Sequence, residues 1–238
     1  MLLQVKGLTK YFGGLAALKN VDFEVDRGKL VGIIGPNGSG KTTIFNCITG
    51  FYNPTSGKII FDGRDITGLP PYKICRLGIA RTFQIPKPFP DLTVLENVMA
   101  GAIGIGESIP KAREKAEEIL KFLGIEKLAY EPAKKMNVCN RKLLELARAL
   151  ATCPKLLLLD EVAAGLNPSE LDSLIERIRK IWKEGVTIIM VEHVMKTVMT
   201  LSEWIIVLHH GEKIAEGTPE MVTEDQKVIE AYLGRKMV

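Results

Sequence analysis

The 238-residue sequence lacks a continuous apolar segment long enough to cross a lipid bilayer. Apolar runs such as residues 156–159 and 204–208 have the length of β-strands, whereas a transmembrane helix needs about 20 residues. The opening residues, MLLQVKGLTK, also lack the cationic segment and long apolar stretch that are typical of a secretory signal. We therefore expect no direct membrane span, so any role at a membrane would require docking onto another chain.

Cysteine is scarce, and clusters of like charge are missing. The four cysteines show no C-x-x-C or C-x-x-H spacing, which disfavours a metal site or a disulfide framework and favours reduced thiols in the cytoplasm. The formal net charge of +4 arises from 32 basic and 28 acidic residues scattered along the chain, without the basic blocks of a nucleic-acid-binding face. We therefore expect no nucleic-acid partner.

The sequence does contain an alternation of strand and helix patterns. Hydrophobic residues make up 46% of the chain, which is enough apolar material for a substantial core. An apolar strand at 30–34 leads through a glycine-rich segment into a helix at about 41–50, and further apolar strands are expected at 155–160 and 186–191. Repeated strand–helix units predict an α/β fold with a mainly parallel sheet. The helical stretch at about 92–152 is expected to form a separate lobe.

Glycine, proline and asparagine predict several boundaries. Three prolines interrupt residues 84–91, which indicates an irregular connector. Pro110 and Gly124 are expected to begin and end a helix, and Asn167 is expected to cap another. Residues 209–211 predict a hairpin turn, to which we assign no chemistry.

Residues 35–42 read GPNGSGKT, which matches the P-loop pattern G-x-x-x-x-G-K-S/T. In this motif the backbone amides point at phosphate oxygens, and the N-terminus of the following helix adds a positive dipole end. Lys41 is expected to reach the β- and γ-phosphates of ATP, and the Thr42 hydroxyl to bind Mg²⁺. The alternative is a chance glycine-rich turn, which the strand before it and the helix after it disfavour. The predicted nucleotide-binding residues are Gly35, Pro36, Asn37, Gly38, Ser39, Gly40, Lys41, Thr42 and Thr43.

Two acidic residues and one histidine follow buried strands, where open α/β sheets bind their ligands. Asp160 is suited to a Mg²⁺ contact, usually through water, and Glu161 to activating the attacking water as a general base. The acidic pair alone would equally suit the capping of the next helix. His193 closes the strand VTIIMVEH, from which an imidazole could contact the γ-phosphate or the water, although a lone histidine there is more often structural.

Taken together, these motifs resemble the nucleotide-binding subunits of ABC transporters over essentially the whole chain. Phe12 resembles the aromatic residue that stacks on adenine, with Tyr11 or an ordinary half-exposed aromatic as alternatives. Gln84 resembles the glutamine that links the γ-phosphate and Mg²⁺ to the membrane subunit, although a plain loop glutamine would fit there too. Residues 164–168 (AGLNP) occupy the place of the family's dimer-contacting loop. The segments most similar to ATPases of branched-chain amino acid uptake are GFYNPTSG, RTFQIPKPFPDLTVLENV, LLELARAL, AAGLNP and EAYLG.

The resemblance implies a P-loop NTPase (RecA-like) core with a mainly parallel sheet and an antiparallel β subdomain, at about 1–91 and 153–238. An inserted α-helical subdomain is implied at about 92–152. It also implies an ATP hydrolase that uses ATP and Mg²⁺, the latter held by Thr42, Gln84 and Asp160. The implied partners are a second ATP-binding subunit, in a homodimer or a heterodimer, and transmembrane permease subunits. The implied location is the cytoplasmic face of the cell membrane.

One motif departs from the family. Where the family has an LSGGQ-type signature that contacts the ATP of the opposite subunit, this chain has Asn137, Val138, Cys139 and Asn140 after Met136. The side chain of Cys139 replaces the family's key glycine and is expected to hinder close backbone approach, while the Asn137 amide can still donate. We therefore predict an asymmetric pair, in which this chain's own P-loop, Asp160, Glu161 and His193 hydrolyse ATP against a partner with an intact signature.

Other functions are less well supported. A P-loop GTPase would carry an N-K-x-D motif, which the sequence lacks. A non-transport ABC protein would usually show a tandem cassette, a long coiled coil or basic arms. A nucleotide-responsive regulatory subunit with impaired hydrolysis is the remaining alternative, because it would account for the altered signature.

Overall fold

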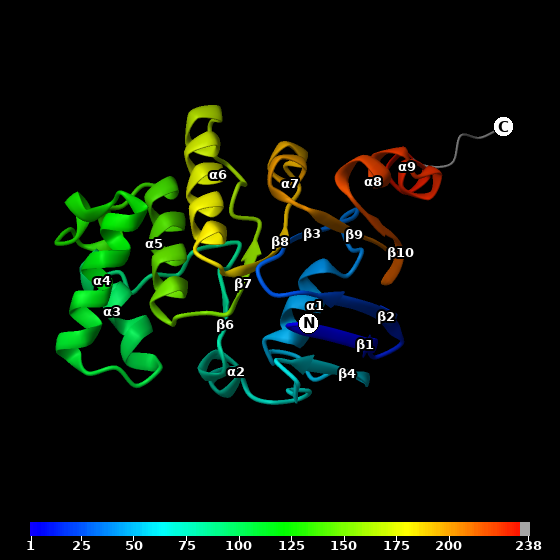
Figure 1. Ribbon diagram of the computed structural model, residues 1–238, viewed down its shortest axis with the longest axis horizontal. Coiled ribbons are helices and arrows are strands. Elements are labelled where there is room, and N and C mark those ends of the chain that lie inside the picture. Colours follow the sequence, from blue (N-terminus) through cyan, green and yellow to red (C-terminus); the bar gives the residue numbers. More distant parts are fainter. Residues whose placement is uncertain (234–238) are drawn as a thin grey trace.

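Two β-sheets form the frame of the protein, whose computed structural model describes residues 1–233 (Figure 1). The strands are β1 (Leu3–Phe12), β2 (Leu15–Val25), β3 (Leu30–Ile34), β4 (Ser56–Phe61), β5 (Arg64–Asp65), β6 (Ile79–Arg81), β7 (Leu156–Asp160), β8 (Thr187–Val191), β9 (Trp204–His209) and β10 (Glu212–Gly217). The helices are α1 (Lys41–Ile48), α2 (Pro71–Leu77), α3 (Val94–Gly104), α4 (Ile109–Leu123), α5 (Val138–Ala151), α6 (Pro168–Lys183), α7 (Met195–Leu201), α8 (Pro219–Glu224) and α9 (Gln226–Leu233), with 3-10 turns η1 (Glu126–Leu128) and η2 (Ala133–Lys135).

The larger sheet has the order β10-β9-β3-β8-β7-β6, and all its strands except β10 run parallel. The prediction of a mainly parallel sheet is therefore confirmed. The smaller sheet, β2-β1-β4-β5, is antiparallel throughout, as the family resemblance implied. In the larger sheet Val191 pairs with both Ile33 and Asp160, and Arg81 pairs with Leu158. This register brings the carboxyl ends of β3, β8, β7 and β6 side by side.

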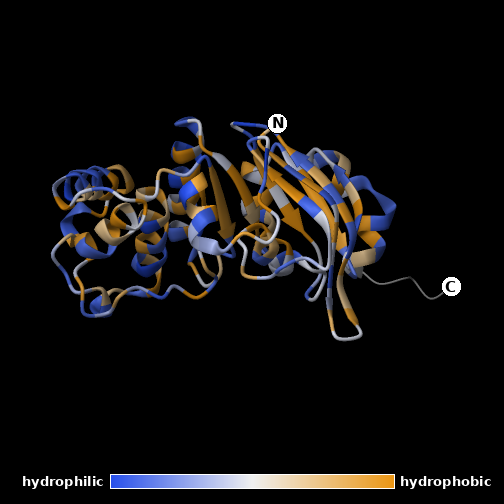
Figure 2. Ribbon diagram, turned by 90° about the horizontal axis from the view of Figure 1, so that it is seen from below, coloured by the Kyte–Doolittle hydropathy of each residue, from blue (hydrophilic) through white to orange (hydrophobic). Residues whose placement is uncertain are grey.

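The parallel sheet is buried on both faces along its central strands, so the interior positions of these strands are apolar. In β7, Leu157 and Leu159 pack into the cluster formed with the helices α3 to α6, whereas Leu156 and Leu158 pack against α1 and the smaller sheet. Figure 2 shows that the central strands are mostly hydrophobic, whereas the outer helices mix hydrophobic and hydrophilic residues. Continuous burial of this kind explains why these strands read as uninterrupted leucine, isoleucine and valine runs.

Helices α3, α4 and α5 lie together at one end of the molecule, in green in Figure 1. Thr93 and Glu96 form a capping box that begins α3, and Gly124 ends α4 with a positive φ of 69°. Small side chains let these helices approach closely: a Cβ on Gly101 of α3 would come within 2.5 Å of the Arg148 carbonyl on α5. The buried alanines of α4, Ala112 and Ala116, serve the same purpose.

Several boundaries differ from the sequence prediction. Helix α5 begins at Val138, so the altered signature segment lies in its first turn rather than before it. Strand β8 ends at Val191, and His193 therefore follows the strand by two residues instead of closing it. Helix α4 begins at Ile109, one residue before Pro110. Asn167 caps α6 as expected. The elements that sequence reasoning did not predict are α2, β6, α7, α8 and α9, all eight residues or shorter, in which helical or strand periodicity is weak.

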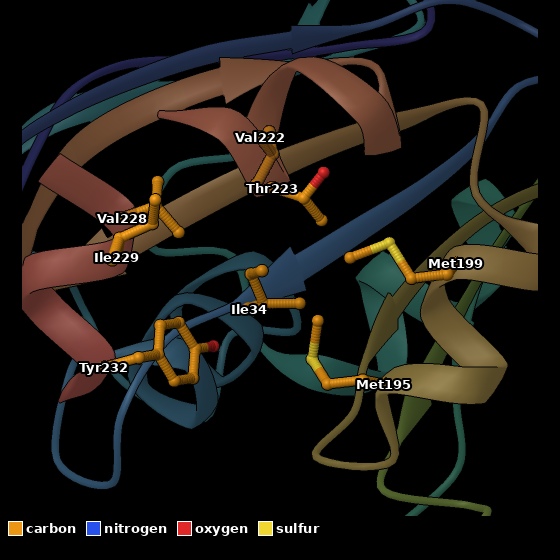
Figure 3. Close-up of a pocket in the computed structure, with 8 residues that line it drawn as sticks. All are labelled: Ile34, Met195, Met199, Val222, Thr223, Val228, Ile229 and Tyr232. Atoms are coloured by element: carbon orange, nitrogen blue, oxygen red, sulfur yellow. The ribbon is translucent and has the colours of Figure 1, made fainter. Parts of the chain in front are cut away.

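The C-terminal helices α8 and α9 pack with α7 over the end of β3 and enclose a pocket of about 290 Å³ (Figure 3). Its walls are apolar and include Ile34, Met195 and Val228, with Tyr232 at one side. Burial raises the pKa of the Tyr232 phenol, and the neighbouring backbone amide of Gly35 partly offsets that rise. Gly234, from the terminal EAYLG segment, lies outside the described residues.

The connector at residues 84–91 is irregular, as its prolines predicted, but one buried side chain holds its far end. Asn97 of α3 is 0% exposed; its Oδ1 accepts a 2.8 Å hydrogen bond from the Phe89 amide, and its Nδ2 donates to the Phe89 and Thr93 carbonyls at 3.0 and 2.9 Å. Asn97 therefore substitutes for the regular hydrogen bonding that the prolines prevent.

Replacing Asn97 with alanine should lower the free energy of unfolding by about 2–3 kcal/mol, because buried backbone groups lose their partners. It should also speed proteolytic cleavage between residues 84 and 91. Urea denaturation and limited proteolysis would measure these effects. Asn53→Ala, at an exposed position, is the control and should change stability by no more than about 0.5 kcal/mol. Equal stability of the two variants would contradict the anchoring role.

Candidate functional site

The candidate site lies where the carboxyl ends of β3, β8, β7 and β6 meet. A pocket of about 230 Å³ opens there. The start of β2, the end of the predicted P-loop and two catalytic candidates line it. The described lining residues are Leu15, Ala16, Ala17, Asn37, Gly38, Ser39, Gly40, Lys41, Thr42, Thr43, Glu161 and His193. The structure thus brings together P-loop and catalytic candidates that are far apart in the sequence.

The P-loop backbone curls because glycine occupies its tightest positions. Gly35 has φ 152°, and a Cβ there would lie 2.1 Å from the Leu208 carbonyl oxygen. Gly40 has φ 107°, and a Cβ there would lie 2.8 Å from the Ala17 carbonyl oxygen. Larger residues would therefore push the loop away from the β2 and β9 backbones. The turn between β9 and β10 supports the loop from outside, since the Gly211 amide donates to the Ser39 carbonyl at 3.1 Å.

Helix α1 presents a bare N-terminus to the pocket. Its N-cap, Gly40, has no side chain to cap the first amides, and its first turn contains no acidic residue. Ser39 adds a buried hydroxyl for which the described chain offers no hydrogen-bond partner. Unpaired amides at a helix N-terminus attract anions, and the curled loop leaves room for them. These features fit a phosphate chain.

The Lys41 ammonium lies folded against the loop that it follows. Lys41 is 5% exposed, and its Nζ donates to the Gly35 and Pro36 carbonyls at 2.8 and 2.9 Å. Burial lowers the pKa of Lys41, while the nearby carboxylates of Glu161 and Asp160 act to raise it. A buried cation close to two carboxylates and a helix N-terminus provides the charge that a triphosphate needs.

Three predicted residues meet around one carboxylate. Glu161 Oε1 lies 3.0 Å from His193 Nε2, and Glu161 Oε2 accepts a 2.5 Å hydrogen bond from Gln84 Nε2. The Glu161 side chain is only 13% exposed, whereas His193 is 43% exposed. A carboxylate fixed from both sides at the edge of the pocket is suited to accepting a proton from a water molecule.

Asp160 lies one residue before this group but has a partner that the sequence did not reveal. Arg81, at the end of β6, donates to Asp160 Oδ2 at 2.6 Å and to Asn46 Oδ1 at 2.6 Å. Both side chains of the ion pair are nearly buried, with exposures of 6% and 4%. The guanidinium also lies 5.2 Å from the ring of Phe83, in a cation–π contact. A cationic residue in RTFQ, three positions before Gln84, was the available signal.

Phe12 and the altered signature segment lie outside the pocket, as far as the described lining residues show. Phe12 ends β1, is 42% exposed, and packs edge-to-face against Tyr52 at 5.1 Å. Asn137 caps α5, since its Oδ1 accepts a 2.8 Å bond from the Asn140 amide. Val138 is 59% exposed, whereas the Cys139 thiol is half-buried, with its pKa raised first by burial and then by Glu170 on α6.

Two buried residues behind Glu161 were also missed by sequence reasoning. Lys142 of α5 is 7% exposed and donates to backbone carbonyls after β7. Glu192 is 2% exposed, and its Oε1 accepts a 2.8 Å hydrogen bond from the Ala163 amide. Burial raises the pKa of Glu192 to about 7, although the Ala163 amide and Lys142 both act to lower it. Only their neighbours in the fold reveal these roles.

Comparison with known proteins gave concordant matches over nearly the whole chain. The sequence profile of the ABC transporter family matches residues 18–164, and that of the branched-chain amino acid ATP-binding cassette transporter matches residues 212–237. The probable branched-chain amino acid transport ATP-binding protein LivG of Archaeoglobus fulgidus is 43% identical, over 98% of this chain and 95% of that protein.

Two solved structures extend these matches to the fold. An ATP-binding cassette of an ABC transporter in its ADP conformation matches with a TM-score of 0.88 and 36% identity, over 98% of this chain and 99% of that one. A dimeric ATP-binding cassette in a post-hydrolysis state, bound to ADP and Pi, matches with a TM-score of 0.83 and 29% identity, over 91% and 98% of the two chains.

The raised pKa of Glu192 predicts a pH-dependent stability. Its folded-state pKa of about 7 exceeds the ordinary glutamate value of 4.5, so the folded protein holds this proton more tightly and loses stability as the pH rises from about 4.5 to 7. Glu192→Gln keeps the acceptor for Ala163 but cannot ionise. The change in the free energy of unfolding that this substitution causes should therefore be more favourable at pH 8 than at pH 5, by on the order of 2–3 kcal/mol.

Urea unfolding at both pH values would measure this difference, with the exposed Glu114→Gln as control. If the free energy of unfolding changed equally with pH in the wild-type protein and in Glu192→Gln, Glu192 would titrate in the ordinary carboxyl range and the prediction would be wrong.

Proposed function

The chain belongs to the ATP-binding subunits of the ABC transporter family, and on this basis we propose that it hydrolyses ATP to drive uptake of branched-chain amino acids. The observation that carries the proposal is the Glu161 carboxylate held between Gln84 and His193 at the edge of the P-loop pocket. The proposal that the transported solutes are branched-chain amino acids rests on the names of the relatives, since the P-loop pocket would bind only the nucleotide.

In the proposed reaction Glu161 acts as general base. It takes a proton from a water molecule whose oxygen attacks the γ-phosphorus, while the bond from that phosphorus to the β–γ bridging oxygen breaks and ADP leaves. His193, at hydrogen-bond distance from Glu161, holds the carboxylate in place. Lys41 and the first amides of α1 stabilise the charge that develops on the phosphate oxygens. Phe12, on the exposed tip of β1, is proposed to stack on adenine.

The residues around the pocket also fit Mg²⁺. This ion favours octahedral oxygen coordination and usually combines one or two carboxylates with substrate phosphates and water. Thr42 is exposed in the pocket, and Asp160 ends strand β7 directly before Glu161, with Arg81 donating to its Oδ2. We propose that Thr42, Asp160 and Gln84 hold the ion, which would neutralise charge on the β- and γ-phosphates.

A groove beside the Gln84 connector supports docking of a permease subunit. It has a volume of about 300 Å³ and lies between the sheet and the helices α3 and α5. The aromatic side chains Phe51, Phe83 and Phe89 line it and are 40–55% exposed. No helix of residues 1–233 is long and apolar enough to cross a membrane. Because the relatives are transport ATP-binding proteins, we propose that the chain docks on the cytoplasmic face of the membrane through this groove.

We propose that a second ATP-binding subunit completes the assembly that hydrolyses ATP. The Asn137 to Asn140 segment would face the ATP of that subunit from the first turn of α5. Because Asn137 and Val138 are exposed there and a family glycine is replaced by Cys139, we propose a heterodimer in which the partner supplies the intact signature.

Glu161→Gln should lower the rate of phosphate release from ATP by about 100-fold or more, because the amide cannot accept the proton. Nucleotide affinity should change little, since the P-loop contacts remain. A continuous phosphate assay and fluorescent-ADP titration would measure both quantities. The exposed Glu184→Gln is the control. Phosphate release by Glu161→Gln at the wild-type rate would refute the general-base role.

The altered signature predicts how the subunits associate. Glu161→Gln protein should remain monomeric when ATP is added, whereas the additional substitution Cys139→Gly should permit an ATP-dependent dimer, because the Cys139 side chain no longer separates the backbone from the phosphate. Light scattering would measure the mass. Cys153→Gly, at an exposed cysteine elsewhere, is the matched control. A dimer of the Glu161→Gln protein without Cys139→Gly would show that the segment still binds ATP, making a homodimer possible.

A further inference from the structure

The ammonium group of Lys142 directs its hydrogen bonds to backbone carbonyls inside the protein. Its Nζ donates to the carbonyl oxygens of Glu161, Val162 and Ala164, at 3.2, 3.0 and 2.5 Å. A lysine has three N–H donors, so these three carbonyls use all of them. Burying a cation is costly unless such partners are in place. The contacts therefore define a specific site, in contrast to a lysine whose end group extends into water.

The backbone that Lys142 holds is the one that carries Glu161. Glu161 has a φ of 49°, a left-handed conformation that is unfavourable for a residue with a Cβ. Its own amide donates to the Val191 carbonyl at 2.8 Å, and the Ala163 amide donates to Glu192 at 2.8 Å. The amides of Glu161 and Ala163 and the three carbonyls that Lys142 binds are thus all hydrogen-bonded, which keeps the chain in this conformation.

The charges around Lys142 support the same arrangement. Burial lowers the pKa of Lys142, and the carboxylates of Glu192 and Glu161 counteract this effect. Glu192 directly precedes His193 in the chain, and His193 Nε2 lies 3.0 Å from Oε1 of the Glu161 carboxylate. Lys142 and Glu192 therefore hold the loop from opposite elements, α5 and the end of β8.

Helix α5 links this clamp to the subunit interface proposed above. Asn137 is its N-cap and Cys139 lies in its first turn, and Lys142 follows Cys139 by three residues, a little less than one turn, on the same helix. The ammonium that binds the three carbonyls extends from α5, so a shift of this helix would change those hydrogen bonds. Helix α5 therefore connects the altered signature with the backbone that carries Glu161.

We propose that Lys142 is a positioning residue for ATP hydrolysis: it fixes the backbone of Glu161 to Ala164 so that the Glu161 carboxylate meets Gln84 and His193, and it ties this geometry to α5. The inference rests on the proposed role of Glu161. Lys142 is not itself among the described residues that line the nucleotide pocket, and it acts through the backbone of Glu161.

The test uses the assembly that hydrolyses ATP, either the chain alone or with its partner subunits. Lys142→Met should lower kcat about 10- to 100-fold, as expected for a displaced catalytic group, and change KM for ATP by less than about threefold. Lys142→Arg, which keeps the charge and several donors, should recover kcat to within about threefold. Lys135→Met, at an exposed position on η2, is the matched control and should have no effect.

A double-mutant comparison separates positioning from general loss of structure. In a Glu161→Gln background, single-turnover phosphate release should fall less than about twofold on adding Lys142→Met, because the residue through which Lys142 acts is already disabled. A full 10-fold loss in that background, or wild-type kcat in Lys142→Met, would overturn the inference. If Lys142→Met does not fold, Lys142→Gln, which keeps amide donors without the charge, undergoes the same comparison.

Different results would refute the general-base role of Glu161 and the positioning role of Lys142. Full hydrolysis by Glu161→Gln would overturn the general-base role and, with it, the role given to Lys142. Loss of hydrolysis in Glu161→Gln together with unchanged hydrolysis in Lys142→Met would overturn only the positioning role.

Discussion

The parallel register of β3, β8, β7 and β6 sets every relationship in the site. Since parallel strands end at the same edge, one alignment delivers the P-loop, His193, the pair Asp160 and Glu161, and the Gln84 connector to adjacent places. A shift of β7 by a single residue would exchange the leucines that face helices α3 to α6 with those that face α1 and the smaller sheet, and it would separate Asp160 from Arg81. Close packing on both faces of β7 opposes such a shift, so core packing and site geometry have the same origin.

Charge balance explains how so polar a site tolerates burial. Lys41, Arg81 and Lys142 lie among Asp160, Glu161 and Glu192, and each cation also binds backbone carbonyls or an amide oxygen. Removal of any one member would leave a buried charge without its partner, which costs far more than an exposed ion pair contributes. The site is therefore better described as one network than as a list of independent residues.

Local patterns in the sequence were sufficient to predict the P-loop, the strands around it and the placement of Glu161 and His193 after neighbouring strands, whereas Gln84 followed only from the family resemblance. Those elements have strong signals: continuous apolar runs, glycines at fixed spacing, and polar residues directly after strands. Arg81 and Lys142 could not be predicted in this way, because their partners lie 79 and about 20 residues away and no periodicity relates them. The position of α5 shows the same limit, since the capping by Asn137 draws the altered signature into a helix whose pattern begins only at Lys142.

Strand β6, from which the Gln84 connector departs, is a three-residue edge strand that pairs, within residues 1–233, with β7 alone. The free energy of local opening varies across a fold, and we expect a short strand that is paired on one side to open before the central strands, so that its amides exchange with solvent first. The site accordingly has a rigid side, formed by β3 and β8, and a side that can open without unfolding the sheet. The nucleotide would be held on the rigid side, while the glutamine that contacts Glu161 belongs to the part of the fold that opens most readily.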